Sequence, residues 1–272
     1  MLYKELGNTG EKIPAVGLGT WGIGGFDTAD YSNDSQLIKT IEEAIEMGYR
    51  HIDTAEYYAS GHSEELVGKA ARSFNRKDLF IVSKVWPNHL SKKDLPKALT
   101  GSLKRLKMDY LDLYLIHWPS SEIPLSETID AMLKAKTEGL VRHIGVSNFD
   151  TELLNKALKI SDYQIVNNQV LFNMENRDPE KKLLPFCIKK GITLTAYSPL
   201  ERTHLSPETR RKLNIVANNH NTSIYQIMLA WLLSKERVIV IPKSTNINHL
   251  RENLNSAEIK LTDDEITFLE EN

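Results

Sequence analysis

Short apolar segments alternate with amphipathic stretches along almost the whole chain. The apolar segments have the length and the β-branched content of buried strands, whereas the stretches between them repeat apolar residues at helical spacing. Strands are predicted at residues 15–19, 50–54, 79–83, 111–116, 143–146, 165–168, 193–196 and 238–241. Helices are predicted at residues 34–47, 63–74, 92–106, 126–138, 151–158, 179–190, 207–219 and 263–270.

The order of these elements predicts an α/β fold. A strand and a helix recur about every 30 residues, which is close to one βαβ step. Eight such units in 272 residues fit a single (β/α)₈ barrel, also called a TIM barrel, which usually has about 250 residues. No long linker, low-complexity tract or charge block divides the chain, so residues 1–272 are predicted to form one domain. A turn signal from Gly7 to Gly10 predicts an N-terminal β-hairpin that closes the bottom of the barrel.

Composition narrows the classes of partner. Hydrophobic residues make up 41% of the chain and charged residues 26%, with a formal net charge of -2, so nothing indicates a nucleic-acid partner. No window reaches the roughly 18 apolar residues of a membrane span, and the N-terminus lacks the apolar stretch of a signal peptide. We therefore expect no membrane partner and a cytoplasmic location. The only cysteine, Cys187, excludes an intrachain disulfide and is interpreted as a small buried apolar residue.

Four polar residues follow the second, third and fourth predicted strands. Because active sites of such barrels form at the C-terminal strand ends, Asp53, Lys84 and His117 are candidates for chemistry. A buried lysine needs a carboxylate nearby, and a lysine beside a tyrosine favours the phenolate and lowers the tyrosine pKa. Tyr57 and Tyr58 compete for this tyrosine position on chemistry alone. With a histidine that can donate a hydrogen bond to a substrate oxygen, the group predicts carbonyl chemistry.

The remaining strand ends suit a cofactor. They offer side-chain amides and hydroxyls for an amide group, an aromatic ring for stacking, and a cation with hydroxyls for a phosphate. Each of them, taken singly, also has an ordinary loop explanation. The residues are Ser147, Asn148, Gln169, Tyr197, Lys243 and Ser244.

Two rival sites are weaker. Gly17, Gly19 and Gly22 satisfy GxGxxG, but the helix that a Rossmann site needs does not open directly from them, so they are interpreted as a tight turn at a strand end. Asp and His at strand ends can also bind divalent ions. The chain lacks HxH and HExxH, and a lysine is an unfavourable neighbour for a metal, so no metal is predicted.

The motifs, taken in their order along the chain, resemble the aldo-keto reductase family over nearly the full length. They are GLGTWG, HIDTAEYY, GHSEELVGKA, SKVWP, DYLDLYLIHWP, GLVRHIGVSNF, NNQV, AYSPL, and IPKS with HLREN. The resemblance implies a (β/α)₈ barrel that binds a nicotinamide dinucleotide without a Rossmann domain. It further implies an NADP-dependent oxidoreductase that reduces aldehydes or ketones to alcohols.

The resemblance also assigns the catalytic roles. Tyr58, five residues after Asp53, matches the acid of the family and would protonate the carbonyl oxygen while hydride reaches the carbonyl carbon. Asp53 and Lys84 match the pair that tunes this acid, and His117 matches the residue that orients the carbonyl. The alternative is a cofactor-binding regulatory protein of the same fold with little turnover. Retention of all four residues favours the enzyme.

Cofactor contacts follow from the same motifs, from the nicotinamide end to the adenine end. They are Thr20, Trp21, Asp53, Ser147, Asn148, Gln169, Tyr197, Ser198, Leu200, Lys243, Ser244, Thr245, Glu252 and Asn253. One departure concerns His249, where many members have arginine, so the preference for a 2′-phosphate is weaker and NAD is the alternative to NADP.

The substrate pocket is predicted to be open. The segments WPSSEIPLSE and ERTHLSPE are short, as in short-loop prokaryotic-type members, and the long family loops that close the pocket are missing. Trp21, Trp86 and Trp118 would line an apolar mouth around His117, which suits small aldehydes of many kinds. A monomer or a weak homo-oligomer is expected.

Overall fold

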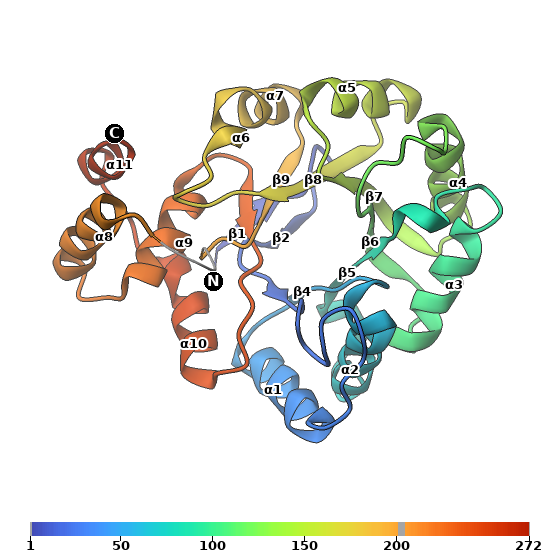
Figure 1. The fold of residues 1–272 in the computed structure, drawn as a ribbon, viewed down its shortest axis with the longest axis horizontal. Helices are drawn as coiled ribbons and strands as arrows, with labels where there is room; N and C mark the ends of the chain where they lie inside the picture. The colour runs from blue at the N-terminus through green and yellow to red at the C-terminus, as the bar shows by residue number, and fades with distance from the viewer. Residues whose placement is uncertain (1, 201–204, 272) are drawn as a thin grey trace.

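The computed structural model describes residues 2–200 and 205–271 of the chain, so residues 201–204 of the ERTHLSPE segment lie outside the described residues. Figure 1 shows a central ring of strands surrounded by helices. Helices α8 and α11 lie on the outer side of α9, farther from the ring of strands. The α/β barrel architecture that the sequence predicted is therefore confirmed.

Eight parallel strands of the described chain form the ring, in the spatial order β10-β9-β8-β7-β6-β5-β4-β3. Each overlaps its predicted segment. The strands are β3 (Leu18–Gly19), β4 (His51–Asp53), β5 (Phe80–Val85), β6 (Leu111–Ile116), β7 (Val141–Ser147), β8 (Ile165–Leu171), β9 (Thr193–Tyr197) and β10 (Val238–Val240). Most residues of these strands are buried, as expected for parallel strands covered by helices.

The ring closes between its first and last strands. Val16 forms a parallel bridge with Val240, and the Gly17 N–H donates to the Val240 carbonyl at 2.8 Å. The predicted hairpin is also present, because β1 (Tyr3–Glu5) pairs in antiparallel register with β2 (Lys12–Pro14). Closure removes both sheet edges, so the strand ends surround one common space.

Helices lie between successive strands of the ring, and two more follow the last strand. They are α1 (Asp34–Met47), α2 (His62–Ala71), α3 (Leu95–Leu106), α4 (Leu125–Thr137), α5 (Thr151–Ile160), α6 (Asp178–Lys181), α7 (Leu183–Lys190), α8 (Pro207–Asn219), α9 (Ile224–Ser234), α10 (Ile247–Asn255) and α11 (Asp263–Glu270). Short 3₁₀ turns lie at η1 (Tyr58–Gly61), η2 (Arg76–Asp78), η3 (Pro87–His89) and η4 (Ser256–Glu258). None of the helices among the described residues is both long and apolar enough to cross a lipid bilayer.

The helices differ from the prediction in four places. Helix α2 ends at Ala71, three residues before the end predicted at Phe74. Residues 179–190 form two helices because the backbone leaves the helical region at Lys182, with φ -140°. Helix α3 begins three residues later than predicted, after Asp94, because the Ser91 and Asp94 side chains close a local turn first. Helix α9 was not predicted at all. It is apolar nearly all round, and Trp231 in it is fully buried.

Candidate active site

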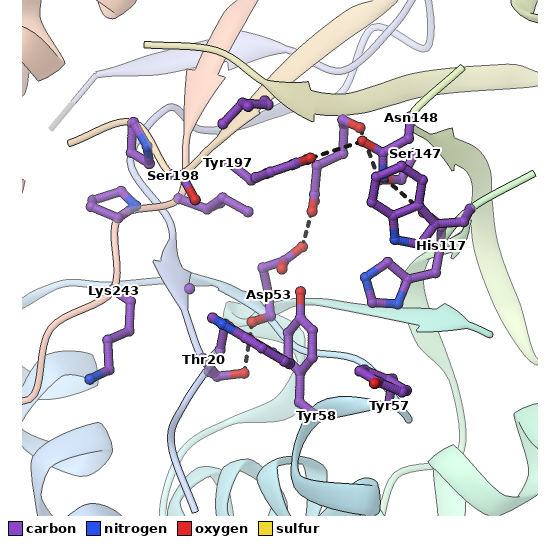
Figure 2. Close-up of a pocket in the computed structure, with 18 of the residues that line it drawn as sticks. Thr20, Asp53, Tyr57, Tyr58, His117, Ser147, Asn148, Tyr197, Ser198 and Lys243 are labelled. Atoms are coloured by element: carbon purple, nitrogen blue, oxygen red, sulfur yellow. Dashed lines mark hydrogen bonds between the residues drawn. The ribbon is translucent and has the colours of Figure 1, made fainter. Parts of the chain in front are cut away.

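A cavity of about 750 Å³ opens where the barrel strands end, and Figure 2 shows the residues around it. Fourteen of the side chains predicted for the site line this cavity. They are Thr20, Trp21, Asp53, Tyr58, Trp86, His117, Trp118, Ser147, Asn148, Gln169, Tyr197, Ser198, Leu200 and Lys243. In Figure 2, Lys243 and Ser198 lie on one side of the pocket, His117 and Tyr57 on the other, and Asp53 and Tyr58 between them.

Lys84 makes three contacts at the centre of the site. Its Nζ donates to Asp53 Oδ1 at 2.5 Å, to the Thr54 carbonyl at 3.0 Å and to the Tyr58 hydroxyl at 2.9 Å. The Lys84 side chain is fully buried. Burial alone would lower the pKa of Lys84, but the Asp53 carboxylate and the Tyr58 hydroxyl outweigh burial and hold the pKa above its ordinary value. Lys84 is therefore a permanent cation beside the Tyr58 hydroxyl.

The structure separates the two adjacent tyrosines that sequence chemistry could not. The Tyr57 hydroxyl donates to Asp27 Oδ1 at 3.0 Å, and this hydrogen bond raises the pKa of Tyr57. Of the two tyrosines, Tyr58 is the one whose hydroxyl accepts a hydrogen bond from Lys84 Nζ. A phenol beside a buried cation can release a proton more readily than a phenol beside a carboxylate, so Tyr58 is the better acid.

His117 follows β6 and closes the site on the side of the aromatic residues. Burial, with a smaller effect of the Lys84 ammonium, lowers the pKa of His117 to about 2. Its ring lies edge-on to Tyr58 and to Trp86, with ring centroids 5.6 Å and 5.1 Å away. The imidazole is therefore neutral at physiological pH, and it can donate or accept a hydrogen bond without carrying charge.

Amide and hydroxyl groups at the ends of β7, β8 and β9 form a connected set. Asn148 Nδ2 donates to Ser147 Oγ at 3.0 Å, and Ser147 Oγ donates to the Gln169 carbonyl at 2.9 Å. The Tyr197 hydroxyl donates to Asn148 Oδ1 at 3.0 Å. Gln169 Nε2 donates to Asp53 Oδ2 at 2.8 Å, so this set is joined to the Lys84 cluster.

Two groups stand at the ends of this arrangement. Thr20 Oγ1 donates to the Asp53 carbonyl at 3.0 Å and so ties β3 to β4. Lys243 follows β10 and lines the cavity with an exposed side chain. A cation at this end lies away from the Asp53 and Tyr58 pair (Figure 2), where it can meet an anionic group of a bound molecule.

The predicted adenine-end residues lie beside this cavity and are not among its lining residues. Ser244 Oγ accepts the Asn246 N–H at 3.0 Å, and Asn246 in turn caps the N-terminus of α10. Asn253 is buried on α10, whereas Thr245 and His249 are exposed. The structure therefore places Ser244 and Thr245 between Lys243 and the start of α10, whereas half-buried Glu252 and buried Asn253 lie in its C-terminal half.

Several cavity residues were not assigned to the site from the sequence, although Tyr57 was considered for the position of the acid. They are Gly19, Phe26, Tyr57, Leu171, Pro199, Ile241 and Pro242. Tyr57 stacks on Trp86 with ring centroids 3.8 Å apart and an interplanar angle of 12°, and Phe26 lies edge-on to Trp21 at 5.6 Å. Phe26 belongs to an irregular loop with no sequence periodicity, so the pattern gave no signal for it. The mouth is more aromatic than the three tryptophans alone indicated.

Metal ligands do not gather in the described part of the chain. Among residues 2–200 and 205–271, no group of three or more His, Cys, Asp or Glu side chains is placed to hold a metal ion. In the site itself, the Asp53 carboxylate is already taken by the Lys84 ammonium and the Gln169 amide. The arrangement is that of an acid–base site.

Known proteins are similar to this chain in sequence and in fold. The sequence profile of the Aldo/keto reductase family matches residues 15–272. Methylglyoxal reductase YeaE of Escherichia coli K12 is 37% identical over 262 residues, which cover 95% of this chain and 90% of that protein. A thermostable aldo-keto reductase crystallised with the inhibitor epalrestat is 60% identical, with a TM-score of 0.98 and coverage of 99% of this chain and 98% of that one.

A further solved structure carries a cofactor. The aldo/keto reductase of Klebsiella pneumoniae in complex with NADP and acetate is 37% identical, with a TM-score of 0.89, and the match covers 95% of this chain and 90% of that one. The family profile, the identities and the barrel agree. The chain therefore belongs to the Aldo/keto reductase family and is an oxidoreductase of that family.

Proposed function

We propose that this aldo-keto reductase reduces small aldehydes, 2-oxoaldehydes among them, to alcohols with NADPH, and that Tyr58 is the general acid. The observation that carries the proposal is the Lys84 Nζ, which contacts Asp53 Oδ1 at 2.5 Å and the Tyr58 hydroxyl at 2.9 Å at the floor of the cavity. A relative at 37% identity is named methylglyoxal reductase, which supports the substrate class.

The donor set of the cavity fits a nicotinamide dinucleotide. Ser147, Asn148 and Gln169 offer the donors and acceptors that a carboxamide needs, and the Tyr197 ring beside them offers a stacking surface. Lys243 supplies a cation for a phosphate at the other side of the pocket. NADPH, when bound, supplies the hydride that the carbonyl carbon accepts.

Residues of the protein supply the proton that the carbonyl oxygen receives. Tyr58 donates its hydroxyl proton to the carbonyl oxygen of the substrate, and the Lys84 ammonium stabilises the phenolate that remains. Asp53 keeps the ammonium in place, because it accepts from Lys84 and from Gln169 with different oxygens. Neutral His117 donates a hydrogen bond to the same carbonyl oxygen and so orients it.

The aromatic mouth supports a preference for small carbonyls of varied shape. Trp21, Tyr57, Trp86 and Trp118 present flat apolar surfaces around His117, and Trp118 is 43% exposed. Few polar groups stand there to select one substituent. Turnover confined to a single narrow class in a panel of aldehydes, ketones and sugars would contradict this part of the proposal.

Cofactor choice and cellular setting complete the proposal. NADP is favoured by relatives crystallised with NADP or NADPH, with NAD as the alternative because His249 stands where many members have arginine. Residues 1–272 as one domain, a cytoplasmic location, a monomer or weak homo-oligomer, and the absence of a metal cofactor and of nucleic-acid or membrane partners stay predictions from the sequence.

The test is NADPH oxidation with methylglyoxal by the wild-type protein and by Tyr58→Phe. We expect the substitution to lower kcat by about 10²-fold or more, because it removes the proton donor and leaves the ring in place. Quenching of tryptophan fluorescence by NADPH should be the same in both proteins. If both bind NADPH and neither turns over any aldehyde of the panel, the cofactor-binding regulatory role replaces the enzyme.

A further inference from the structure

The turn that carries Tyr58 is tied to the loop that follows β3. The Ala59 N–H donates to the Phe26 carbonyl at 2.6 Å, and Ser60 Oγ donates to the Asp27 carbonyl at 2.8 Å. These two residues come directly after Tyr58 in the chain. The backbone position of the acid therefore depends on a segment that lies outside the barrel strands.

The side chain just before Tyr58 is tied to the same loop. The Tyr57 hydroxyl donates to Asp27 Oδ1 at 3.0 Å. This hydrogen bond holds the Tyr57 ring nearly parallel to Trp86, with centroids 3.8 Å apart, and nearly parallel to Trp21 at 6.2 Å. Asp27 thus contacts the turn on both sides of Tyr58, through its carboxylate and through its carbonyl.

The turn needs such ties because its backbone is strained. Ala59 and Ser60 have φ values of 50° and 53°, and Gly61 follows with a φ of 91°. Three successive left-handed residues are unfavourable when two of them carry a Cβ, so the free chain would leave this conformation. Without an outside constraint, relaxation of this turn would move the Tyr58 hydroxyl away from Lys84.

We propose that Asp27 is a positioning residue for carbonyl reduction, which holds residues 57–60 so that the Tyr58 hydroxyl stays against Lys84. The inference rests on the proposed role of Tyr58 as general acid. Asp27 is itself exposed and contributes nothing to the hydrophobic core. Removal of its carboxylate takes away the contact to Tyr57 and leaves the two backbone carbonyl contacts of the loop in place. It should therefore affect the acid and spare the fold.

The experiment compares four single variants and the double variant that combines Asp27→Ala with Tyr57→Phe. Asp27→Ala removes the carboxylate, Asp27→Asn keeps the Oδ1 acceptor, and Tyr57→Phe removes the donor that faces it. The matched control is Asp30→Ala, an exposed carboxylate of the same loop whose Oδ1 accepts the Ser32 N–H. Each variant is assayed for kcat and KM with methylglyoxal, for the pH dependence of kcat/KM, for NADPH affinity by fluorescence and for its unfolding midpoint.

We expect Asp27→Ala to lower kcat by about tenfold, since small displacements of a catalytic group have effects of this order or larger. Because a phenol farther from Lys84 keeps its proton to higher pH, the basic limb of kcat/KM should move to higher pH. Asp27→Asn should stay within about twofold of wild type, and Tyr57→Phe added to Asp27→Ala should cause no further loss. NADPH affinity and the unfolding midpoint should not change.

The inference is overturned if Asp27→Ala keeps the wild-type kcat and basic limb, or if Asp30→Ala shows the same losses. It is also overturned if kcat falls only in step with the unfolding midpoint. These outcomes differ from failure of the proposed function, which Tyr58→Phe reports independently. An inactive Tyr58→Phe together with a fully active Asp27→Ala would contradict the role of Asp27 and leave the proposed function intact.

Discussion

At the residue scale, the site is defined by one ammonium group that uses all its donors. Lys84 Nζ has three acceptors within 3.0 Å, namely Asp53 Oδ1, the Thr54 carbonyl and the Tyr58 hydroxyl. An ammonium carries three hydrogens, so each is assigned and the side chain has no alternative orientation of similar energy. A buried charge is tolerated here because Asp53 compensates it, and Tyr58 receives the field of that charge.

Replacing this ammonium tests the acid directly. We expect Lys84→Met to lower kcat on the order of 10²-fold, because the phenolate left by proton transfer loses its counter-charge. The basic limb of kcat/KM should move to higher pH, since a phenol that loses an adjacent cation keeps its proton to higher pH. Lys84→Arg keeps a cation and serves as control. An unchanged basic limb in Lys84→Met would show that the Tyr58 proton does not depend on Lys84.

His117 gives a pH dependence of stability with a definite sign. Its pKa is about 2 in the folded chain and about 6.5 in an unfolded one, so the unfolded state binds the extra proton between these values. The contribution of neutral His117 to the free energy of unfolding is therefore fully present above about pH 6.5. It decreases as pH falls below this value, by up to about 1.4 kcal/mol per pH unit. Urea unfolding of wild type and His117→Gln at about pH 7 and 5 measures this loss. Equal losses in both proteins would contradict the prediction, and exposed His249→Gln is the control.

The positions of the proposed catalytic residues were predictable because strand ends are periodic features of the sequence. Asp53, Lys84 and His117 each follow a run of buried residues, and the barrel brings such positions together whatever the loops do. The choice between Tyr57 and Tyr58 was not predictable from chemistry, because it depends on where the turn points each hydroxyl. Phe26 gave no signal either, since its loop has no periodic pattern.

At the scale of elements, the predictions succeeded where a helix has one polar face. Helix α1 was predicted with its observed bounds because its apolar residues repeat at helical spacing and Gly48 follows it. Helix α9 was missed because a segment that is apolar all round shows no helical period, although Ser223 and Gln226 form a capping box at its start. The turn at η1 was missed because left-handed Ala59 and Ser60 run against local preference.

Lys4 is one of the side chains that anchor the N-terminal hairpin. Lys4 Nζ donates to the carbonyls of Leu233, Lys235 and Val238, each at 2.7 Å, and so joins β1 to the end of α9 and to β10. Lys4→Met should lower the free energy of unfolding by about 2 to 4 kcal/mol, because these buried carbonyls lose their donor. Lys12→Met, on the exposed side of the same hairpin, should change it by less than about 1 kcal/mol. Urea unfolding measures both, and equal effects would exclude an anchoring role.

At the scale of the whole molecule, the barrel joins residues that are far apart in sequence and on opposite walls. Strands β4 and β8 are four places apart in the ring of eight described strands, whichever way the ring is followed. Gln169 near the C-terminal end of β8 nevertheless donates to Asp53 at the end of β4, at 2.8 Å across 116 positions of sequence. The sequence placed both residues at strand ends but could not show that they meet, because contact across the barrel depends on its diameter.

This contact predicts that a residue proposed to hold the cofactor also tunes the acid. In Gln169→Leu, Asp53 loses a donor, binds the Lys84 ammonium more strongly, and so weakens the support that Lys84 gives to the Tyr58 phenolate. At saturating NADPH, kcat should fall about tenfold and the basic limb of kcat/KM should move to higher pH. Asn148→Ala removes another proposed carboxamide contact but no contact to Asp53, so the basic limb of its kcat/KM should stay at the wild-type pH. If the basic limb of kcat/KM lies at the same pH in the two variants, Gln169 acts on the cofactor alone. Proton transfer then does not depend on the contact across the barrel.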